Sequence, residues 1–336
     1  MGVTDTNPLP LHEFHQNLRA RFTSVNGAEA VADFGDALGE HAALRATAGV
    51  LDLSFRGRLC LVGADRVRFL HGQVTSDVKK LRVGEGCYAA LVTAKGKMES
   101  DLNIFALQDE LLLDFEPGLA QTVSQRLEKF IVADDVQVVD VSPHYGLLSV
   151  QGPKAEAVVR AAGLFGVPPS GGPGGENNAS RVNGELPTGP LNFIKATEAT
   201  PGEIYLMNQP RLAPVISAGR ADLQVGPTGS GFDLFVPSVA LAAVADKLIA
   251  AAKSVGGRAC GWTAFDTARI EAGIPRFGVD MDETNIPLEC GIEDRAVSYT
   301  KGCYIGQEVI NRIHSIGHVN RELRGLRLAD DAECRR

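Results

Sequence analysis

An internal repeat constrains the fold of this 336-residue chain more than any other feature of its sequence. In each copy a short apolar strand opens onto a helix, and a later apolar strand leads through a proline into a second helix. A proline in the first turn of a helix loses no hydrogen bond. The expected strands and helices cover 58–63, 65–73, 111–115 and 117–130 in the first copy, and 146–152, 154–162, 231–236 and 237–253 in the second. The order strand, helix, strand, strand, helix, strand therefore occurs twice, which predicts an α+β protein of two packed ferredoxin-like units.

The composition indicates how the chain divides. With 44% hydrophobic and 22% charged residues, the chain can bury a large core and split into two or three domains. We expect a first α+β unit over residues 1–145, a second over 146–256, and a third region over 257–336. Inside the second unit, residues 166–190 are rich in glycine and proline, which predicts a mobile inserted loop. A phosphate-binding loop is disfavoured there because the strand and lysine that such loops need are missing.

Charge and cysteine usage exclude several classes of function. The net charge of −8 argues against direct nucleic-acid binding and against an anionic membrane surface. None of the six cysteines forms a Cys-x-x-Cys pair, which favours reduced thiols. The first residues lack the apolar core of a signal peptide, and the apolar stretch 240–252 is too short and too polar to span a bilayer. We therefore expect a cytoplasmic protein. His314 and His318 are interpreted as surface residues, and no metal site is predicted.

One short motif carries an unusual combination of side chains. It places Cys303 between two glycines, with a cation before it and an amide and a carboxylate after it; its residues are Lys301, Gly302, Cys303, Tyr304, Gly306, Gln307 and Glu308. Glycines permit positive φ and close approach to another surface. A neighbouring ammonium group favours the thiolate, which would make Cys303 a better nucleophile or ligand. The alternative is a small buried cysteine that packs beneath a turn.

The surrounding sequence resembles the glycine-cleavage T-protein superfamily. The segment 269–275, which reads RIEAGIP, is followed by NIPLE at 285–289 and then by KGCYIGQE. Within the superfamily, the cysteine and glutamine of this last motif are similar to the YgfZ branch. The KGKM segment at 95–98 also resembles the start of a strand in that branch. The resemblance extends from about residue 30 to about residue 325.

This resemblance implies a tetrahydrofolate site in a central cavity between the domains. The implied cofactor-binding residues are Met98, Asp101, Asp233 and Arg269. A carboxylate at Asp101 suits the paired donors of a pterin, although Asp101 could instead lie on the wet face of its strand. Asp233 follows a segment in which Pro227 and Ser230 replace the tyrosine and glutamate of the T-protein pattern. Arg269 could pair with the glutamate tail of folate, or form a salt bridge with Asp266 or Glu271.

Two functions remain open at this point. The first is a folate-binding accessory protein in iron-sulfur cluster assembly or repair, whose partners would be assembly proteins or client enzymes such as tRNA-modifying ones. Cys303 would then act as a transient ligand or redox thiol. The second is a tetrahydrofolate-dependent aminomethyltransferase of the glycine cleavage system, with Asp101 as catalytic carboxylate. Ser100 and Ser230 stand where the T-protein pattern has acids that would stabilise developing charge, which favours the first function.

The C-terminal region departs from the superfamily pattern. T-protein relatives continue beyond the KG motif into a small β-barrel, and residues 321–328 are expected to form its first strand. The chain then ends at Arg336 after a polar run. This pattern predicts a truncated barrel with an unpaired strand edge.

Overall fold

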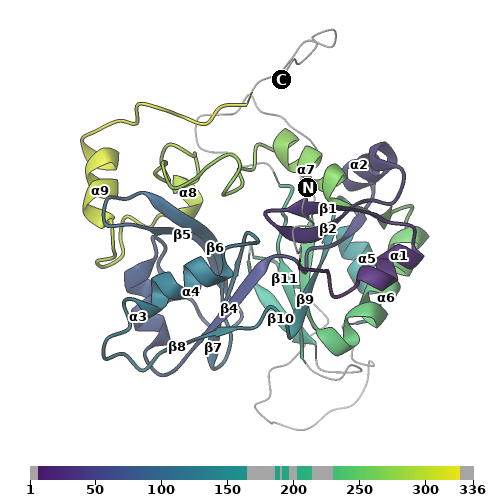
Figure 1. Ribbon diagram of the computed structural model, residues 1–336, viewed down its shortest axis with the longest axis horizontal. Coiled ribbons are helices and arrows are strands. Elements are labelled where there is room, and N and C mark those ends of the chain that lie inside the picture. The colour runs from purple at the N-terminus through teal and green to yellow at the C-terminus, as the bar shows by residue number, and fades with distance from the viewer. Residues whose placement is uncertain (1–6, 165–185, 190, 197–202, 214–229, 326–336) are drawn as a thin grey trace, which may run out of the picture.

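The structure is a computed structural model that describes residues 7–164, 186–189, 191–196, 203–213 and 230–325. It is an α+β protein in which two sheets pack face to face, with helices on their outer faces (Figure 1). The expected loop 166–190 lies outside the described residues except for 186–189. No helix in the described ranges combines the length and apolar character needed to cross a membrane.

The first sheet contains five antiparallel strands in the order β5-β6-β7-β4-β8. Without the edge strand β5, its order of elements is the strand, helix, strand, strand, helix, strand pattern expected from the sequence. The elements are β4 (Gly57–Val62), α3 (Arg66–Gln73), η1 (Val78–Lys80), β5 (Gly86–Val92), β6 (Met98–Ala106), β7 (Glu110–Phe115), α4 (Ala120–Glu128) and β8 (Gln137–Asp140).

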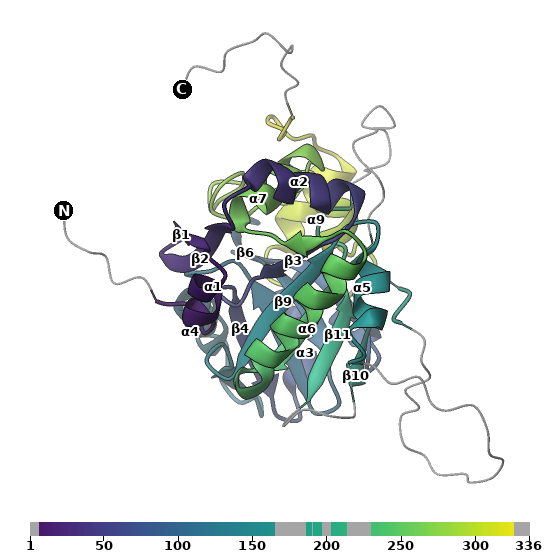
Figure 2. The same ribbon diagram turned by 90° about the vertical axis from the view of Figure 1, so that its right-hand side faces the viewer.

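Among the described residues, the second sheet contains six strands in the order β10-β11-β12-β9-β3-β13, of which only the β13–β3 pair is parallel. Helices α5 and α6 cover its outer face (Figure 2). Strand β3 comes from the first 145 residues of the chain and is inserted between β9 and β13. The elements are β3 (Gly49–Asp52), β9 (Tyr145–Gln151), α5 (Ala155–Ala161), β10 (Phe193–Ala196), β11 (Ile204–Asn208), β12 (Gly231–Pro237), η2 (Ser238–Ala240), α6 (Leu241–Ser254) and β13 (Arg258–Ala259).

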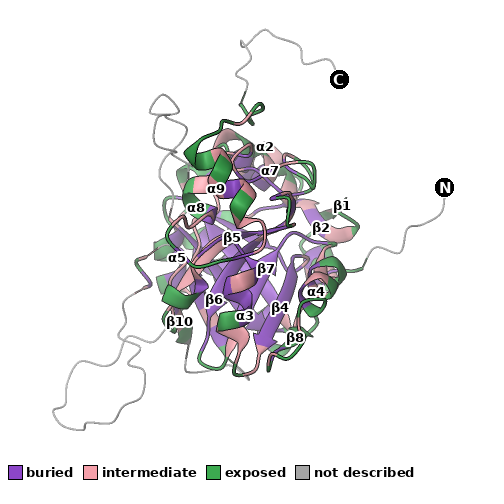
Figure 3. Ribbon diagram, turned by 90° about the vertical axis from the view of Figure 1, so that its left-hand side faces the viewer, coloured by how far each residue is buried: buried purple, intermediate pink, exposed green. Residues whose placement is uncertain are grey.

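The alternation of side chains along the strands explains this layered arrangement. In β4, Leu59 and Leu61 point toward α3 and α4, whereas Cys60 points into a core shared with the second sheet. Phe105 of β6 and Phe235 of β12 meet in that shared core with their ring centroids 5.8 Å apart. Because successive residues of a strand face opposite sides, a strand that is apolar in both phases must be covered on both faces. The central strands of both sheets are accordingly buried, whereas the outer helices carry many of the exposed residues (Figure 3). Strands β1 and β8 are mostly exposed.

The remaining elements cover the two ends of the sandwich. Helix α2 packs against α7, while α8 and α9 lie on the opposite side of the molecule (Figure 1). Residues 321–325, the described part of the expected barrel strand, lie in no strand, and the rest of that segment is outside the described residues. The elements are α1 (His12–Asn17), β1 (Arg21–Val25), β2 (Ala28–Asp33), α2 (Ala37–Ala46), α7 (Trp262–Glu271), α8 (Glu293–Ala296) and α9 (Gln307–Ser315).

The KGKM segment at 95–98 and the KGCYIGQE motif at 301–308, about 200 residues apart in the sequence, pack against each other. Gly306 has φ +86° and starts α9, and a Cβ added to it would lie 2.5 Å from the carbonyl oxygen of Thr93 and 3.3 Å from the Cα of Gly96. Gly96 has φ +71° and abuts the side chain of Val309. The expectation of positive φ is therefore confirmed for Gly306, but it is wrong for Gly302. Only glycine allows the start of α9 to rest on the turn between β5 and β6.

Because of this contact, substitution of Gly306 and substitution of Gly302 should have different effects on stability. Gly306→Ala should lower the free energy of unfolding by about 1–3 kcal/mol, because its positive φ and the Thr93 carbonyl both oppose a Cβ. Gly302→Ala is the matched control, since an added Cβ there meets nothing closer than 3.8 Å. Urea unfolding of both variants measures the difference. Equal losses at the two positions would contradict the packing described for Gly306.

Candidate functional site

A cavity of about 620 Å³ lies where the two sheets meet the segment that follows α7. Strands β5 and β6 supply Tyr88, Asp101 and Asn103 to its wall. Five arginines from several elements also line the cavity: Arg56, Arg211, Arg269, Arg276 and Arg295. A cavity of this size is in the usual range for small-molecule sites. Its lining is unusually rich in charge, which predicts a polar ligand.

Asp101 carries a buried carboxylate oxygen in the cavity wall that no other described residue satisfies. Its Oδ2 accepts a hydrogen bond of 2.8 Å from the hydroxyl of Tyr88, whereas its Oδ1 is buried without a hydrogen-bond partner among the described residues. Burial raises the pKa of Asp101 to about 6, and the nearby charge of Glu116 acts in the same direction. The side chain therefore faces the cavity rather than the wet face of β6. It can exchange a proton near neutral pH.

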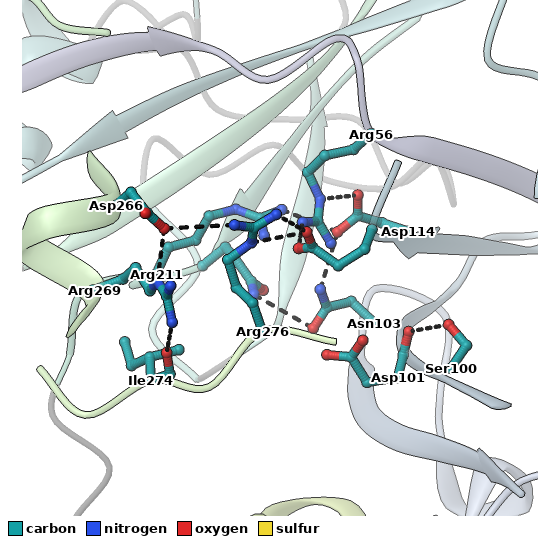
Figure 4. A network of polar contacts seen from close by, with 12 residues as sticks. Arg56, Ser100, Asp101, Asn103, Asp114, Arg211, Asp266, Arg269, Ile274 and Arg276 are labelled. Atoms are coloured by element: carbon teal, nitrogen blue, oxygen red, sulfur yellow. Dashed lines mark hydrogen bonds and ion pairs between the residues drawn. The ribbon is translucent and has the colours of Figure 1, made fainter. Parts of the chain in front are cut away.

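A chain of buried ion pairs forms the floor of the site and joins the two sheets (Figure 4). Asp114 of β7 accepts hydrogen bonds from Arg56 at 2.8 Å and from Arg211 at 3.0 Å. Arg211 also donates from Nε to Asp233 of β12 at 2.8 Å. Burial alone would raise the pKa of Asp114, but the two guanidinium groups outweigh it and hold that pKa well below its ordinary value. Asp114 and Asp233 are therefore already paired with arginines, whereas Asp101 can still accept a hydrogen bond from a ligand.

Arg269 lines the cavity, but its guanidinium group is already hydrogen-bonded to neighbouring residues of the protein. It donates to Asp266 at 2.8 Å, to Asp280, and to the carbonyl of Ile274 at 3.2 Å. Its side chain is only 4% exposed. The alternative expected from the sequence, a salt bridge with Asp266, is therefore present, whereas Glu271 pairs with His41 and Arg45 instead.

The other two expected folate contacts do not reach the cavity wall. Asp233 is fully buried between Arg211 and Ser149. Met98 is also fully buried and packs in an apolar core with Cys290. Both residues lie in the interior of the protein and not among the residues that line the cavity. Contact between either residue and a ligand stays a prediction.

The KGCYIGQE motif anchors the C-terminal segment rather than lining the cavity. The Nζ of Lys301 donates to the carbonyls of His71, Val74 and Ser76 at 2.6, 2.7 and 2.7 Å, which uses all three of its protons at the C-terminal end of α3. Burial lowers the pKa of Lys301 to about 8. Lys301 is therefore held by backbone oxygens.

The rest of the motif divides between core and surface. Tyr304 is buried under Lys301, and Gln307 begins the first turn of α9. Cys303 and Glu308 are exposed, and neither lines the cavity. The structure therefore does not bring Cys303 and Asp101 into one site. In the described part of the chain, no three His, Cys, Asp or Glu side chains gather in a way that could hold a metal ion.

The sequence analysis missed most of the charged residues around the cavity. Arg56, Glu116, Arg211 and Arg276 belong to no motif and come together only when the two sheets pack. One signal was available, because Asp114 interrupts the apolar strand 111–115 and a buried carboxylate requires a cationic partner. That partner could not be identified from spacing along the chain.

Comparison with known proteins shows the family of this chain. The family model described as "GCVT N-terminal domain" matches residues 11–164 and 224–301, which include the whole first sheet and the second sheet apart from β10 and β11. The chain belongs to this family. The match ends within the KGCYIGQE motif, at Lys301.

Two relatives of this GCVT-family chain and one solved structure similar to it are named aminomethyltransferase. The aminomethyltransferase of Corynebacterium jeikeium is 28% identical over 92% of this chain and 75% of its own length. The aminomethyltransferase of Ralstonia pickettii is 32% identical over 84% of this chain and 69% of its own length. The crystal structure of glycine cleavage system aminomethyltransferase T from Bartonella henselae matches with a TM-score of 0.75 at 24% identity, covering 93% of this chain and 76% of that one. This structure shows a shared fold.

The raised pKa of Asp101 makes a testable contribution to stability. Its ordinary pKa is 3.8 and its folded pKa is about 6, so the folded state disfavours the carboxylate, and stability is lost as the pH rises between these values. Asp101→Asn should therefore raise the free energy of unfolding by about 1–3 kcal/mol at pH 7 and have little effect at pH 4.

Urea unfolding at both pH values measures this difference. Asp109→Asn, at an exposed position on the turn after β6, serves as the matched control and should change neither value. A gain for Asp101→Asn that is the same at pH 4 and pH 7 would show that the carboxylate is not destabilised by burial.

Proposed function

We propose that this GCVT-family protein binds tetrahydrofolate in the cavity, with Asp101 as the partner of the pterin ring, and acts in aminomethyl transfer. The observation that carries the proposal is the buried Oδ1 of Asp101, which has no partner in the described protein. An unsatisfied buried acceptor costs about 1–3 kcal/mol, and a ligand that donates to it removes that cost. The pterin ring presents such donors on one edge.

A second polar atom supports the same ligand. Gln209 also lines the cavity, and its Oε1 is buried without a partner among the described residues, while its Nε2 lies 3.4 Å from the Oδ1 of Asn103. Two unsatisfied acceptors in one cavity match a ring that carries several N–H groups. The cavity wall also includes Tyr88 and Phe265, which offer apolar surface to a flat ring.

Aminomethyl transfer is supported by the names of the relatives and by the proton chemistry available at Asp101. Bound tetrahydrofolate supplies the nitrogen that accepts the one-carbon unit. A carboxyl group with a pKa of about 6 can take or return a proton near neutral pH. Tyr88 orients the Asp101 carboxylate through its hydroxyl. Ser100, which replaces an acid of the T-protein pattern, is buried and donates to the backbone carbonyl of Asp101 at 3.0 Å.

Exposure of Cys303 favours a second candidate function, that of a YgfZ-type accessory protein in iron-sulfur cluster assembly or repair. Among the described cysteines, Cys60, Cys260 and Cys290 are buried and Cys87 is half-buried, whereas Cys303 is exposed beside the start of α9. A thiol at this position can be reached by a client or assembly protein. Both candidate functions include folate binding, so folate binding cannot distinguish them. An assay of aminomethyl transfer and tests of the Cys303 thiol can.

Folate binding tests the proposal directly. Tetrahydrofolate at about 100 times its Kd should stabilise the native protein by about 2.7 kcal/mol and raise its melting temperature. Asp101→Asn should weaken binding by roughly 10- to 100-fold, because a hydrogen bond to a charged group contributes about 1.5–3 kcal/mol. Calorimetric titration measures the affinity, and Asp109→Asn should bind like wild type. If saturating tetrahydrofolate leaves the wild-type melting curve unchanged, the ligand assignment is wrong.

A transfer assay separates the two candidate functions. Wild type is expected to form methylene-tetrahydrofolate from an aminomethyl group carried on a lipoyl protein, with release of ammonia and of the free lipoyl thiol, and Asp101→Asn is expected to lose this turnover. Tight folate binding without any turnover would refute aminomethyl transfer and leave the accessory function.

The accessory function makes its own prediction at Cys303. An exposed thiol should react with iodoacetamide at least roughly 10 times faster than buried Cys60, and Cys303→Ala should keep the stability and folate affinity of wild type. In cells lacking the protein, Cys303→Ala should then fail to restore iron-sulfur enzyme activity. Slow alkylation combined with a large loss of stability would instead identify Cys303 as a packing residue.

A further inference from the structure

We propose that His71 and Asp77 form a base that takes the proton of the Cys303 thiol, so that this thiol exchanges with disulfides at neutral pH. None of the three residues lines the cavity, and the exchange needs no folate. This reaction goes beyond both candidate functions given above. Folate binding and disulfide exchange can therefore be tested separately.

The loop that carries Cys303 is fastened at both ends to the C-terminal end of helix α3. The Nζ of Lys301 donates to the carbonyl of His71 at 2.6 Å, and the backbone N–H of Ile305 donates to the carbonyl of Gly72 at 3.1 Å. Cys303 lies midway between these two contacts in the sequence and is exposed. The two hydrogen bonds therefore hold the loop against the end of α3 while its thiol stays accessible.

The imidazole of His71 faces this loop. A Cβ added to Gly302 would lie 3.8 Å from the Nε2 of His71. His71 is only 7% exposed, and its Nδ1 is buried without a hydrogen-bond partner among the described residues. Cys303 follows Gly302 directly, and an exposed side chain changes rotamer within nanoseconds. His71 is therefore placed to meet the thiol through Nε2.

Asp77 orients the imidazole for this role. Its Oδ1 lies 3.4 Å from the Nδ1 of His71. A carboxylate beside Nδ1 favours the tautomer that carries the proton on that nitrogen, which leaves the lone pair of Nε2 as a proton acceptor.

The charge state of His71 suits a base. Burial lowers the pKa of His71, and the positive charges of Lys301 and Lys79 act in the same direction, whereas Asp77 opposes them. These three are the charged groups of the described chain that face His71. The imidazole is therefore neutral at pH 7 and can take a proton.

Lys301 cannot be the base, although the sequence indicated it as the group that favours the thiolate. Its ammonium group donates to three backbone carbonyls and has no lone pair to accept a proton. A base matters because a free thiol is only a few per cent thiolate at neutral pH. His71 supplies the missing acceptor.

The reaction balances with a disulfide as its only other reactant. The Sγ–H bond of Cys303 breaks and its proton moves to the Nε2 of His71. The thiolate attacks one sulfur of the disulfide, so that a new S–S bond forms to Cys303 as the old S–S bond breaks. The departing thiolate takes the proton from His71. Cys303 is oxidised to a mixed disulfide and the departing sulfur is reduced to a thiol.

The experiment measures the rate at which Cys303 of the full chain forms a mixed disulfide with glutathione disulfide. Mass spectrometry of the peptide that contains Cys303 follows the reaction at pH 7 and at about pH 9.5, where a thiol of ordinary pKa near 8.5 is ionised without help. The variants are His71→Gln and Asp77→Asn. The matched control is His144→Gln, which replaces an exposed histidine in the turn before β9.

At pH 7, His71→Gln should react roughly 10-fold more slowly than wild type, because the thiolate fraction falls to that of an unassisted thiol. Asp77→Asn should show a smaller loss, and His144→Gln should match wild type. Near pH 9.5 all four proteins should react at the same rate within about twofold.

Equal slowing of His71→Gln at both pH values would show that the substitution changes access to Cys303 rather than its ionisation, which would overturn the proposal. A rate at pH 7 equal to that of wild type in either His71→Gln or Asp77→Asn would also overturn it. If His71→Gln does not give the cooperative melting curve of wild type, Asp77→Asn decides the question by the same two comparisons.

Discussion

The buried contact of Arg211 with Asp114 and Asp233 holds the site together. Each carboxylate lies in a mostly apolar strand, one in each sheet, and both are completely buried. A buried charge without a partner is so unfavourable that the two sheets must dock with Arg211 between them. Removing one partner from such a pair costs roughly 3–5 kcal/mol, so the pairing specifies one relative position of the sheets. The relative position of the two sheets in turn determines the shape of the cavity between them and the segment after α7.

The sequence was sufficient to predict the local elements and insufficient to predict how they meet. Strands such as 58–63 and 231–236 are apolar runs with clear turn signals, so their position follows from local physics. Strand β3 has only four residues and lies in a sheet formed mostly by the second half of the chain. Its place in that sheet depends on pairing with strands about 100 and 200 residues away in the sequence. Asp101 and Arg269 were predicted from motifs, and both line the cavity. Tyr88 and Arg295 have no motif, and only the packed structure brings them to the same wall.

The most unusual motif of the sequence has a structural role that its composition did not reveal. Lys301 satisfies three carbonyls at the end of α3, and Gly306 lets α9 rest on the β5–β6 turn. Both contacts lie beside strands β5 and β6, which carry Tyr88 and Asp101. The motif therefore fixes the strand pair that forms one wall of the cavity, while its thiol remains at the surface. One short motif thus combines an internal anchor with an exposed thiol.

The insertion of β3 ties the two halves of the chain into one folding unit. Residues 49–52 are made early but pair with β9 and β13, which are made much later, so the second sheet cannot be completed from its own half. Contacts of such long sequence separation slow folding, because the loop between the partners must be closed first. A fragment beginning at residue 146 would expose the edge of β9 where β3 belongs, and a second copy of the chain could donate its own β3 there. Exchange of this strand between molecules is the route to a domain-swapped dimer that the topology itself provides.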